Sequence, residues 1–402
     1  MEEGRISQPR IQDRDDRAAP RVALVHDFLL DIRGAERVFA AICAIWPDAD
    51  VFTAVYDERG TERRFAGRRI HTSYLQRLHP TSATFRSLLP LYPNAIERLD
   101  LSSYDVVVSS SSAWAHGVIA DEATHICYCH NPFRYAWNAR EATLSQRGPV
   151  GRAALGALFS RWRQWDWIAA QRVDRYVANS RTTQRRIERY YGRESTVLYP
   201  PVETARFAPG PVGDYYVVLS ELMPHKRIEV AVEAFNRLRR PLVVLGDGPD
   251  SRRLRRLAGP TVRFEGRVSD ARVAHVLQGA RALVVTATEE FGIAAVEAQA
   301  AGRPVVALAE GGVRETVTEG ETGTFYLAPD PEALAAAVAD FDPLEIDPAA
   351  CTASAARFDA ERFGRTLRAI VDETRGEATA RPPHPRVRRR SRRGPGRWRL
   401  PA

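Results

Sequence analysis

The stretch Glu289-Glu-Phe-Gly-Ile-Ala-Ala-Val-Glu297 follows Ala282-Leu-Val-Val-Thr286, an apolar run that is typical of a buried strand. Gly292 allows a tight turn and a close approach of a ligand to the backbone, and a helix is predicted to begin there. The N-terminus of a helix binds phosphate through free N–H groups and the helix dipole. Glu289 and Glu297 would be separated by about 12 Å if the segment were helical throughout. This spacing suits two carboxylates that hold the two hydroxylated ends of one ligand, although it equally allows an ordinary helix with one exposed acid.

Two further glycine turns follow predicted strands in the same half of the chain. Gly311-Gly-Val-Arg-Glu315 comes after residues 304–308, and Gly246-Asp-Gly248 comes after residues 241–245. Loops at the carboxyl ends of parallel strands form the ligand crevice of a doubly wound sheet. Any one of these turns could be a plain turn, but the three together favour a binding crevice.

Apolar strands alternate with amphipathic helices along the chain, and the pattern starts again near its middle. Strands are predicted at residues 21–27, 51–55, 104–108, 124–130 and 174–180, and then at 216–219, 241–245, 262–264, 282–286 and 304–308. This order predicts an α/β protein with two Rossmann-like, doubly wound domains that face each other across a cleft. The expected division is a disordered leader (1–20), a first domain (21–197), a second domain (198–350), a closing helix (351–378) and a basic disordered tail (379–402).

Two polar residues outside these turns are candidates for the crevice. Lys226 precedes a predicted helix over 228–238 and could reach a diphosphate, although it could equally be a solvated surface lysine. His130 ends a predicted strand, where it would face the cleft or serve as a structural histidine. Asp48-Ala-Asp50 resembles a metal motif but precedes its strand, at the wrong end for the crevice, so no metal is expected.

The charge and the composition exclude several classes of protein. The net charge of the 402 residues is +8, but nine arginines lie between Arg381 and Arg399, so the rest of the chain carries 8 − 9 = −1. A near-neutral body argues against specific nucleic-acid binding. Four scattered cysteines argue against a disulfide framework. With no apolar signal region and no apolar run of ~18 residues, the expected location is the cytoplasm.

Several motifs in this order make the chain resemble the retaining glycosyltransferases of the GT-B fold, family 4 type, over about residues 21–375. The subgroup that it resembles most contains mannosyltransferases of bacterial surface-polysaccharide (O-antigen and exopolysaccharide) assembly. The motifs are Gly34-Ala-Glu-Arg37, Cys127-Tyr-Cys-His-Asn-Pro-Phe-Arg-Tyr-Ala-Trp137, Val177-Ala-Asn-Ser180, Tyr199-Pro-Pro-Val202, Lys226, Gly246-Asp-Gly248, Phe264-Glu-Gly-Arg-Val-Ser-Asp270 and the Glu289/Glu297 pair.

The resemblance implies a role for each matching residue. Glu297 would hold the nucleotide ribose, Glu289 would hold the donor sugar with His130 beside it, and Lys226 would neutralise the leaving diphosphate. Gly34 would border the diphosphate and the acceptor. The residues implied in donor binding are Gly34, Lys226, Gly246, Gly266, Arg267, Val268, Glu289, Phe291, Gly292, Ile293 and Glu297, and those implied in catalysis are His130, Lys226 and Glu289.

Two positions depart from the family pattern. Glu221 stands where many members carry an arginine that shares the diphosphate with the lysine, and Arg33 replaces the first of two glycines in the first loop. Without that arginine, neutralisation of the phosphates falls to Lys226, the helix N-terminus and either Arg181 or Arg227. Either the first loop is adjusted, or Arg33 itself meets the phosphate. Both departures bear on donor affinity more than on reaction type.

The resemblance implies transfer of a hexose, with mannose from GDP-mannose as the expected donor group, to a lipid-linked or polysaccharide acceptor without a metal. A nucleotide-sugar epimerase of the same fold and a catalytically silent nucleotide-sugar-binding scaffold remain alternatives. The arginine-rich tail could bind the anionic inner face of the plasma membrane at ~1 kcal/mol per basic residue, which predicts a peripheral association. It could equally bind nucleic acid without sequence specificity, or have no role.

Overall fold

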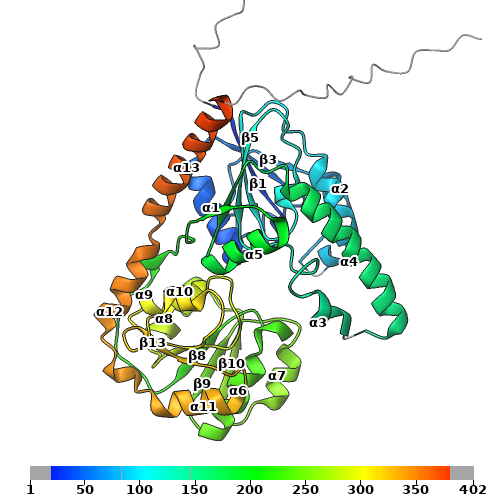
Figure 1. Ribbon diagram of the computed structural model, residues 1–402. Coiled ribbons are helices and arrows are strands. Elements are labelled where there is room, and N and C mark those ends of the chain that lie inside the picture. Colours follow the sequence, from blue (N-terminus) through cyan, green and yellow to red (C-terminus); the bar gives the residue numbers. More distant parts are fainter. Residues whose placement is uncertain (1–19, 83, 146, 381–402) are drawn as a thin grey trace, which may run out of the picture.

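The computed structural model describes residues 20–82, 84–145 and 147–380. Apart from Pro20, Thr379 and Ala380, the expected leader and basic tail lie outside these residues. Two α/β domains lie end to end, and each contains one parallel sheet with helices on both faces (Figure 1). The expected fold class is therefore observed in both halves of the chain.

The first domain is built on a seven-stranded sheet in the order β3-β2-β1-β4-β5-β6-β7, with every neighbouring pair parallel. One face packs against α1 and α13, and the other against α2 and α4. Because both faces are buried, the strands are nearly continuous apolar runs. The strands are β1 (Val22–His26), β2 (Asp50–Thr53), β3 (Ile70–Thr72), β4 (Val106–Ser111), β5 (Thr124–Cys129), β6 (Arg175–Ala178) and β7 (Ser195–Val197), and the helices are α1 (Gly34–Ile45), α2 (Tyr92–Glu97), α3 (Arg140–Ser145), α4 (Pro149–Ala170) and α5 (Arg181–Tyr191).

The second domain is built on a six-stranded parallel sheet in the order β10-β9-β8-β11-β12-β13. Helices α6 and α11 pack on one face, and α8, α9 and α12 pack on the other. The strands are β8 (Tyr216–Leu219), β9 (Leu242–Leu245), β10 (Val262–Gly266), β11 (Leu283–Val285), β12 (Val305–Leu308) and β13 (Gly323–Tyr326), and the helices are α6 (Ile228–Leu238), α7 (Ser251–Leu257), α8 (Asp270–Gln278), α9 (Ile293–Ala300), α10 (Val313–Thr316), α11 (Pro331–Asp340) and α12 (Pro348–Ala355).

The strand orders place a topological switch point between β1 and β4 in the first sheet and between β8 and β11 in the second. Ligands of doubly wound sheets bind outside the carboxyl ends of the strands at such points. Gly34 follows β1, Lys226 follows β8 and Glu289 follows β11. The fold thus brings these three predicted site residues to the two switch points.

The end of the described chain returns from the second domain to the first (Figure 1). In the segment 351–378, where a closing helix is expected, α12 ends at Ala355 and a separate helix, α13 (Ala360–Ala380), follows. The Asp359 carboxylate accepts a hydrogen bond from the backbone N of Arg362 at 2.9 Å, which caps a new helix start. Helix α13 then buries Phe363 and Leu367 against the first sheet, so both domains share this end of the chain.

The other differences from the sequence-based expectation concern short or polar strands. Strands β3, β7 and β13 have only three or four residues and lie at or next to a sheet edge, where the apolar pattern is weak. Strand β4 continues through three buried serines, although the predicted strand ends at Val108. Ser109 and Ser110 are each 2.8 Å from a histidine nitrogen, so their burial leaves no unmet hydrogen bond. In the part of the chain described, no helix is long and apolar enough to cross a membrane.

Candidate functional site

The N-termini of two helices from opposite domains meet in the cleft. Gly34 is the first residue of α1, and a Cβ added there would lie 3.1 Å from Cδ1 of Ile293, the first residue of α9. Gly292 caps α9 with φ +95°, a backbone conformation that favours glycine. Since both helices direct the positive ends of their dipoles at this point, the junction is suited to an anion.

Lys226 and Glu289 pair beside this junction. Lys226 Nζ donates to the two Glu289 carboxylate oxygens at 2.8 and 2.7 Å, which joins the loop after β8 to the loop after β11. Burial alone would lower the pKa of Lys226, but the carboxylates of Glu289 and Glu290 outweigh burial and raise it. The ammonium therefore stays charged, as a diphosphate ligand must.

Lys226 is also the only lysine in the 402-residue chain, which uses arginine for its other 57 basic residues. An ammonium is a compact point charge, whereas a guanidinium is a broad planar fork. That the sequence contains one lysine is a signal visible without the structure. Its partly buried ion pair favours a binding role over a surface position.

The turn at Gly311-Gly312 packs against the backbone of Glu289. The backbone N of Gly312 donates to the carbonyl oxygen of Glu289 at 2.7 Å, and a Cβ at Gly311 would lie 2.3 Å from that oxygen. Gly311 also has φ +78°. Only glycine fits this approach, so the turn sets the position of the backbone that carries Glu289.

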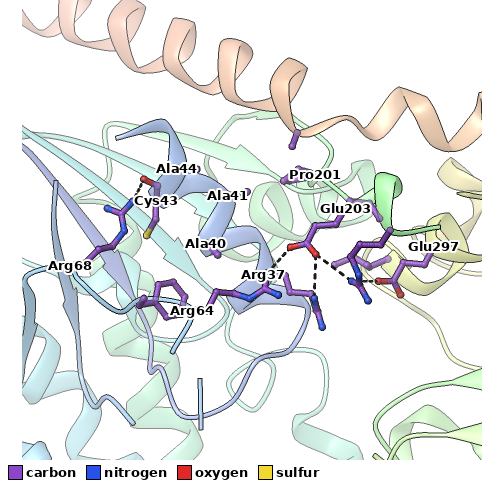
Figure 2. A pocket seen from close by; sticks show the side chains of 15 residues that line it. Arg37, Ala40, Ala41, Cys43, Ala44, Arg64, Arg68, Pro201, Glu203 and Glu297 are labelled. Carbon is purple, nitrogen blue, oxygen red and sulfur yellow. Dashed lines mark hydrogen bonds and ion pairs between the residues drawn. The ribbon is translucent and has the colours of Figure 1, made fainter. Parts of the chain in front are cut away.

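Glu297 faces a cavity of about 420 Å³ between the domains (Figure 2). Its side chain is 11% exposed, and Arg206 Nη1 lies 3.8 Å from Oε1. Burial raises the pKa of Glu297 to about 7, against the opposing effect of Arg206 and Arg37. Glu297 therefore changes charge near neutral pH, which gives this site a measurable pH dependence.

The rim of the same cavity carries an ion-pair network that spans both domains. Arg37 of α1 donates to both oxygens of Asp270 at 3.0 and 2.5 Å, and Arg64 lies 2.6 Å from Glu203. Arg206, in the connection between the domains, reaches Asp270 at 3.3 Å. These charges balance one another, so the cavity is polar without a large net charge.

His130 is buried, and its imidazole is held by a chain of polar groups. Its Nε2 lies 2.8 Å from Ser110 Oγ, which lies 3.1 Å from Nδ1 of His26, and His26 Nε2 lies 3.6 Å from Glu36 of α1. Burial, together with His26, lowers the pKa of His130 to about 3. His130 is therefore neutral at physiological pH and can offer a hydrogen bond but no charge.

The remaining predicted donor residues lie at the ends of β9 to β11. Gly246 has φ +125° and binds the carbonyl of Gly266 at 2.8 Å, which ties two loops together. The Arg267 guanidinium lies 3.6 Å from Asp31 of the first domain. Val268 packs partly buried in the second-domain core, and Phe291 is buried beside Tyr199 and Phe358. Phe291 therefore presents its backbone, and not its ring, to a ligand.

Glu290 has no spacing signal in the sequence, yet it joins the two domains. Its Oε1 lies 3.2 Å from Arg134, in the His-Asn-Pro-Phe-Arg motif, and 3.1 Å from Arg186 of α5. Burial would raise the pKa of Glu290, but Arg134, Lys226 and Arg186 together lower it.

Glu315 makes a second interdomain contact of this kind. Its carboxylate accepts from the backbone N atoms of Arg181 and Thr182 at 2.8 and 3.1 Å, at the N-terminus of α5. Both acids lie within quoted motifs, but only their partners in the other domain show what they bind.

Two families match consecutive parts of the chain. The family described as Glycosyltransferase Family 4 matches residues 32–206, and the family described as Glycosyl transferases group 1 matches residues 214–341. Together these matches cover both domains and the residues of the cleft.

Curated relatives match parts of the chain. A GDP-mannose-dependent alpha-(1-6)-phosphatidylinositol monomannoside mannosyltransferase of Mycolicibacterium smegmatis is 30% identical over 251 residues, covering 51% of this chain and 66% of the relative. A D-inositol 3-phosphate glycosyltransferase of Catenulispora acidiphila is 33% identical over 203 residues, covering 42% of this chain and 47% of the relative. The chain thus spans between about half and just under two thirds of the lengths of these relatives.

Solved structures share the fold at low identity. HepE of Anabaena, in complex with UDP and glucose, matches with a TM-score of 0.66 and 17% identity over 88% of this chain and all of that one. Sucrose-phosphate synthase of Thermosynechococcus elongatus matches with a TM-score of 0.70 and 18% identity over 89% of this chain and all of that one. The expected arrangement of two facing Rossmann-like domains is confirmed by this likeness.

Proposed function

From the family matches over both domains and the GT-B fold, we propose that the chain is a retaining transferase of glycosyltransferase family 4 that uses a nucleotide-sugar donor. The observation that carries this proposal is the Lys226–Glu289 pair beside the junction of α1 and α9. A carboxylate counter-anion on a partly buried ammonium, next to two helix N-termini, marks a site that a diphosphate can enter.

The donor is proposed to lie along the second domain. The diphosphate would take the junction and Lys226, and the ribose hydroxyls would bind Glu297, whose carboxylate faces the cavity. The sugar would meet Glu289, the backbone of Phe291, Gly292 and Ile293, and the neutral imidazole of His130. The base would contact the backbone from Gly266 to Val268.

The chemistry follows from the charge that develops. When the glycosyl–phosphate bond breaks, its electron pair passes to the diphosphate and positive charge develops on the sugar. Lys226 and the two helix N-termini are fixed before reaction, so they stabilise the leaving group without reorganisation. An acceptor hydroxyl that attacks from the face of the leaving group gives retention and can pass its proton to the diphosphate.

The donor and acceptor are proposed from the relatives. The name of the first relative specifies GDP-mannose, which agrees with the mannose expected from the motifs. The names of both relatives refer to inositol-containing molecules, one of them a lipid. We propose a lipid-linked or polysaccharide acceptor of cell-surface glycan assembly, reached at the membrane with the help of the basic tail.

The test is nucleotide release from GDP-mannose, with UDP-glucose as a second donor, in the presence and absence of a membrane lipid extract. Release that requires the extract and is lost in Glu297→Ala supports a transferase with a lipid acceptor. The matched control is Glu321→Ala, which removes an exposed acid from the same domain.

The other outcomes identify the alternatives. Release without any acceptor would instead indicate an epimerase or a hydrolase. Nucleotide binding without release from either donor would indicate a silent scaffold. For the tail, equal sedimentation with anionic liposomes of the full chain and of a chain that ends at Thr379 would contradict the proposed membrane contact.

A further inference from the structure

Arg33 and Glu221, the two residues that depart from the family pattern, bind each other across the cleft. Arg33 precedes α1 in the first domain, and Glu221 lies in the loop after β8 in the second. Arg33 Nη1 lies 3.0 and 3.2 Å from the two Glu221 carboxylate oxygens, while Nη2 lies 2.9 Å from Asp31. Burial would lower the pKa of Arg33, but Glu221 and Asp31 raise it, so the guanidinium is charged and held by two acids.

The position of this guanidinium is unfavourable without an anion. Arg33 is the N-cap residue of α1, where the helix dipole is positive and a cation is disfavoured. The next residue, Gly34, meets Ile293 at the junction proposed for the diphosphate. Glu221 belongs to the same loop as Lys226, five residues earlier. Arg33 therefore lies at the edge of the proposed anion site. The side of its guanidinium that faces the second domain is occupied by the Glu221 carboxylate.

The ion pair around Lys226 has the same form. In each pair a cation of the cleft holds a carboxylate of the second domain, Glu289 for Lys226 and Glu221 for Arg33. A diphosphate carries negative charge on both phosphate groups, and a guanidinium binds phosphate oxygens with its planar fork. Asp31 contacts the other side of Arg33, so the guanidinium remains oriented when Glu221 leaves.

Resting on the proposed function, we propose that Arg33 is a donor-binding residue for the diphosphate and that Glu221 competes with the donor for it. Donor binding then exchanges the Glu221 carboxylate for a phosphate oxygen, with no covalent step. The same exchange lets Glu221 help to displace the nucleoside diphosphate product.

The test is calorimetric titration of GDP at fixed pH and salt into the full chain and its variants. Glu221→Gln removes the competing charge and is expected to tighten GDP binding by about tenfold. Arg33→Gln is expected to weaken binding by about tenfold or more, and Arg33→Lys to weaken it less. In Arg33→Gln/Glu221→Gln the gain from Glu221→Gln should disappear, because the competition requires Arg33.

The control for general electrostatics is Glu58→Gln, since Glu58 pairs with Arg63 at 3.5 Å in the first domain and neither residue is placed at the donor site. Equal gains from Glu58→Gln and Glu221→Gln, or the same gain with and without Arg33, would overturn the inference and leave the proposed function intact. A wild-type chain that binds no nucleoside diphosphate would overturn both. Thermal unfolding of each variant shows whether a loss of binding reflects a loss of fold.

Discussion

Lys226 Nζ lies 2.7 Å from one carboxylate oxygen of Glu289 and 2.8 Å from the other, so the only lysine of the chain is neutralised by an acid that follows a different strand. The pair connects the loops that follow β8 and β11, the strands on either side of the switch point. Both partners are predicted to contact the donor.

Replacing Lys226 tests the charge at the diphosphate. Lys226→Ala is expected to raise the activation free energy by ~1.5–3 kcal/mol, because a charge-assisted contact to the leaving group is lost. This corresponds to a decrease in kcat/KM of about 10–150-fold. Steady-state nucleotide release measures this change. Arg252→Ala, which removes an exposed positive charge on α7, is the control and should leave kcat/KM unchanged. Undiminished turnover in Lys226→Ala would remove this residue from the site.

The raised pKa of Glu297, about 7, predicts how donor binding depends on pH. An ionised carboxylate accepts hydrogen bonds from two ribose hydroxyls, whereas the protonated form accepts fewer. Affinity for GDP-mannose should therefore fall as pH decreases through 7, by about tenfold between pH 8 and pH 6. GDP-mannose is the appropriate probe because its esterified diphosphate does not titrate in this range.

Glu297→Gln should bind GDP-mannose weakly and without this pH dependence. The groups that face Glu297 are Arg206, Arg37, Asp270 and Glu203. Glu203→Gln is therefore the matched control: it should keep a transition, shifted below pH 7 because the Glu203 carboxylate helps to raise the pKa of Glu297. A wild-type affinity that stays constant from pH 6 to pH 8 would contradict this role for Glu297.

The contact between Ser110 and His130 predicts a positioning effect. Ser110→Ala removes the partner of His130 Nε2 and should lower kcat more than it raises KM, because the imidazole loses its orientation beside the donor sugar. The shape of the pH profile of kcat between pH 5 and pH 8 should be the same in Ser110→Ala as in the wild type, since a pKa of about 3 keeps His130 neutral throughout. Ser109→Ala, which removes from β4 the hydrogen-bond partner of His125 on β5, serves as the comparison. A new ionisation in the Ser110→Ala profile would contradict this assignment.

Glu315 is predicted to stabilise the interface between the domains. Glu315→Ala leaves the backbone N atoms of Arg181 and Thr182 without their carboxylate and should cost ~0.5–2 kcal/mol, as the loss of a helix cap does. This cost corresponds to a decrease in Tm of about 2–4 °C for each kcal/mol. Calorimetry of Glu315→Ala, with Glu321→Ala as the control, measures this decrease. Equal Tm values for the two variants would show that the contact contributes no stability.

The amino-acid sequence by itself determined the strands, the turns and the candidate residues of the second domain. Apolar runs such as Val305–Leu308 are local signals, because a strand that is buried on both faces admits few polar side chains. Gly292 and Gly311 are local signals as well, since their positive φ angles exclude most other residues. The order of strands and helices then implied two doubly wound sheets, which the structure contains.

Only the tertiary structure decided which charged groups meet across the cleft. Arg33 and Glu221 are 188 residues apart in the chain, and Glu290 is 156 residues from Arg134. No periodicity or turn signal links residues at such separations, because their contact depends on how the two sheets are oriented. The sequence could mark Arg33 and Glu221 as two separate departures. Their pairing follows from the packing of one domain on the other, which places an arginine of the first domain on an acid of the second.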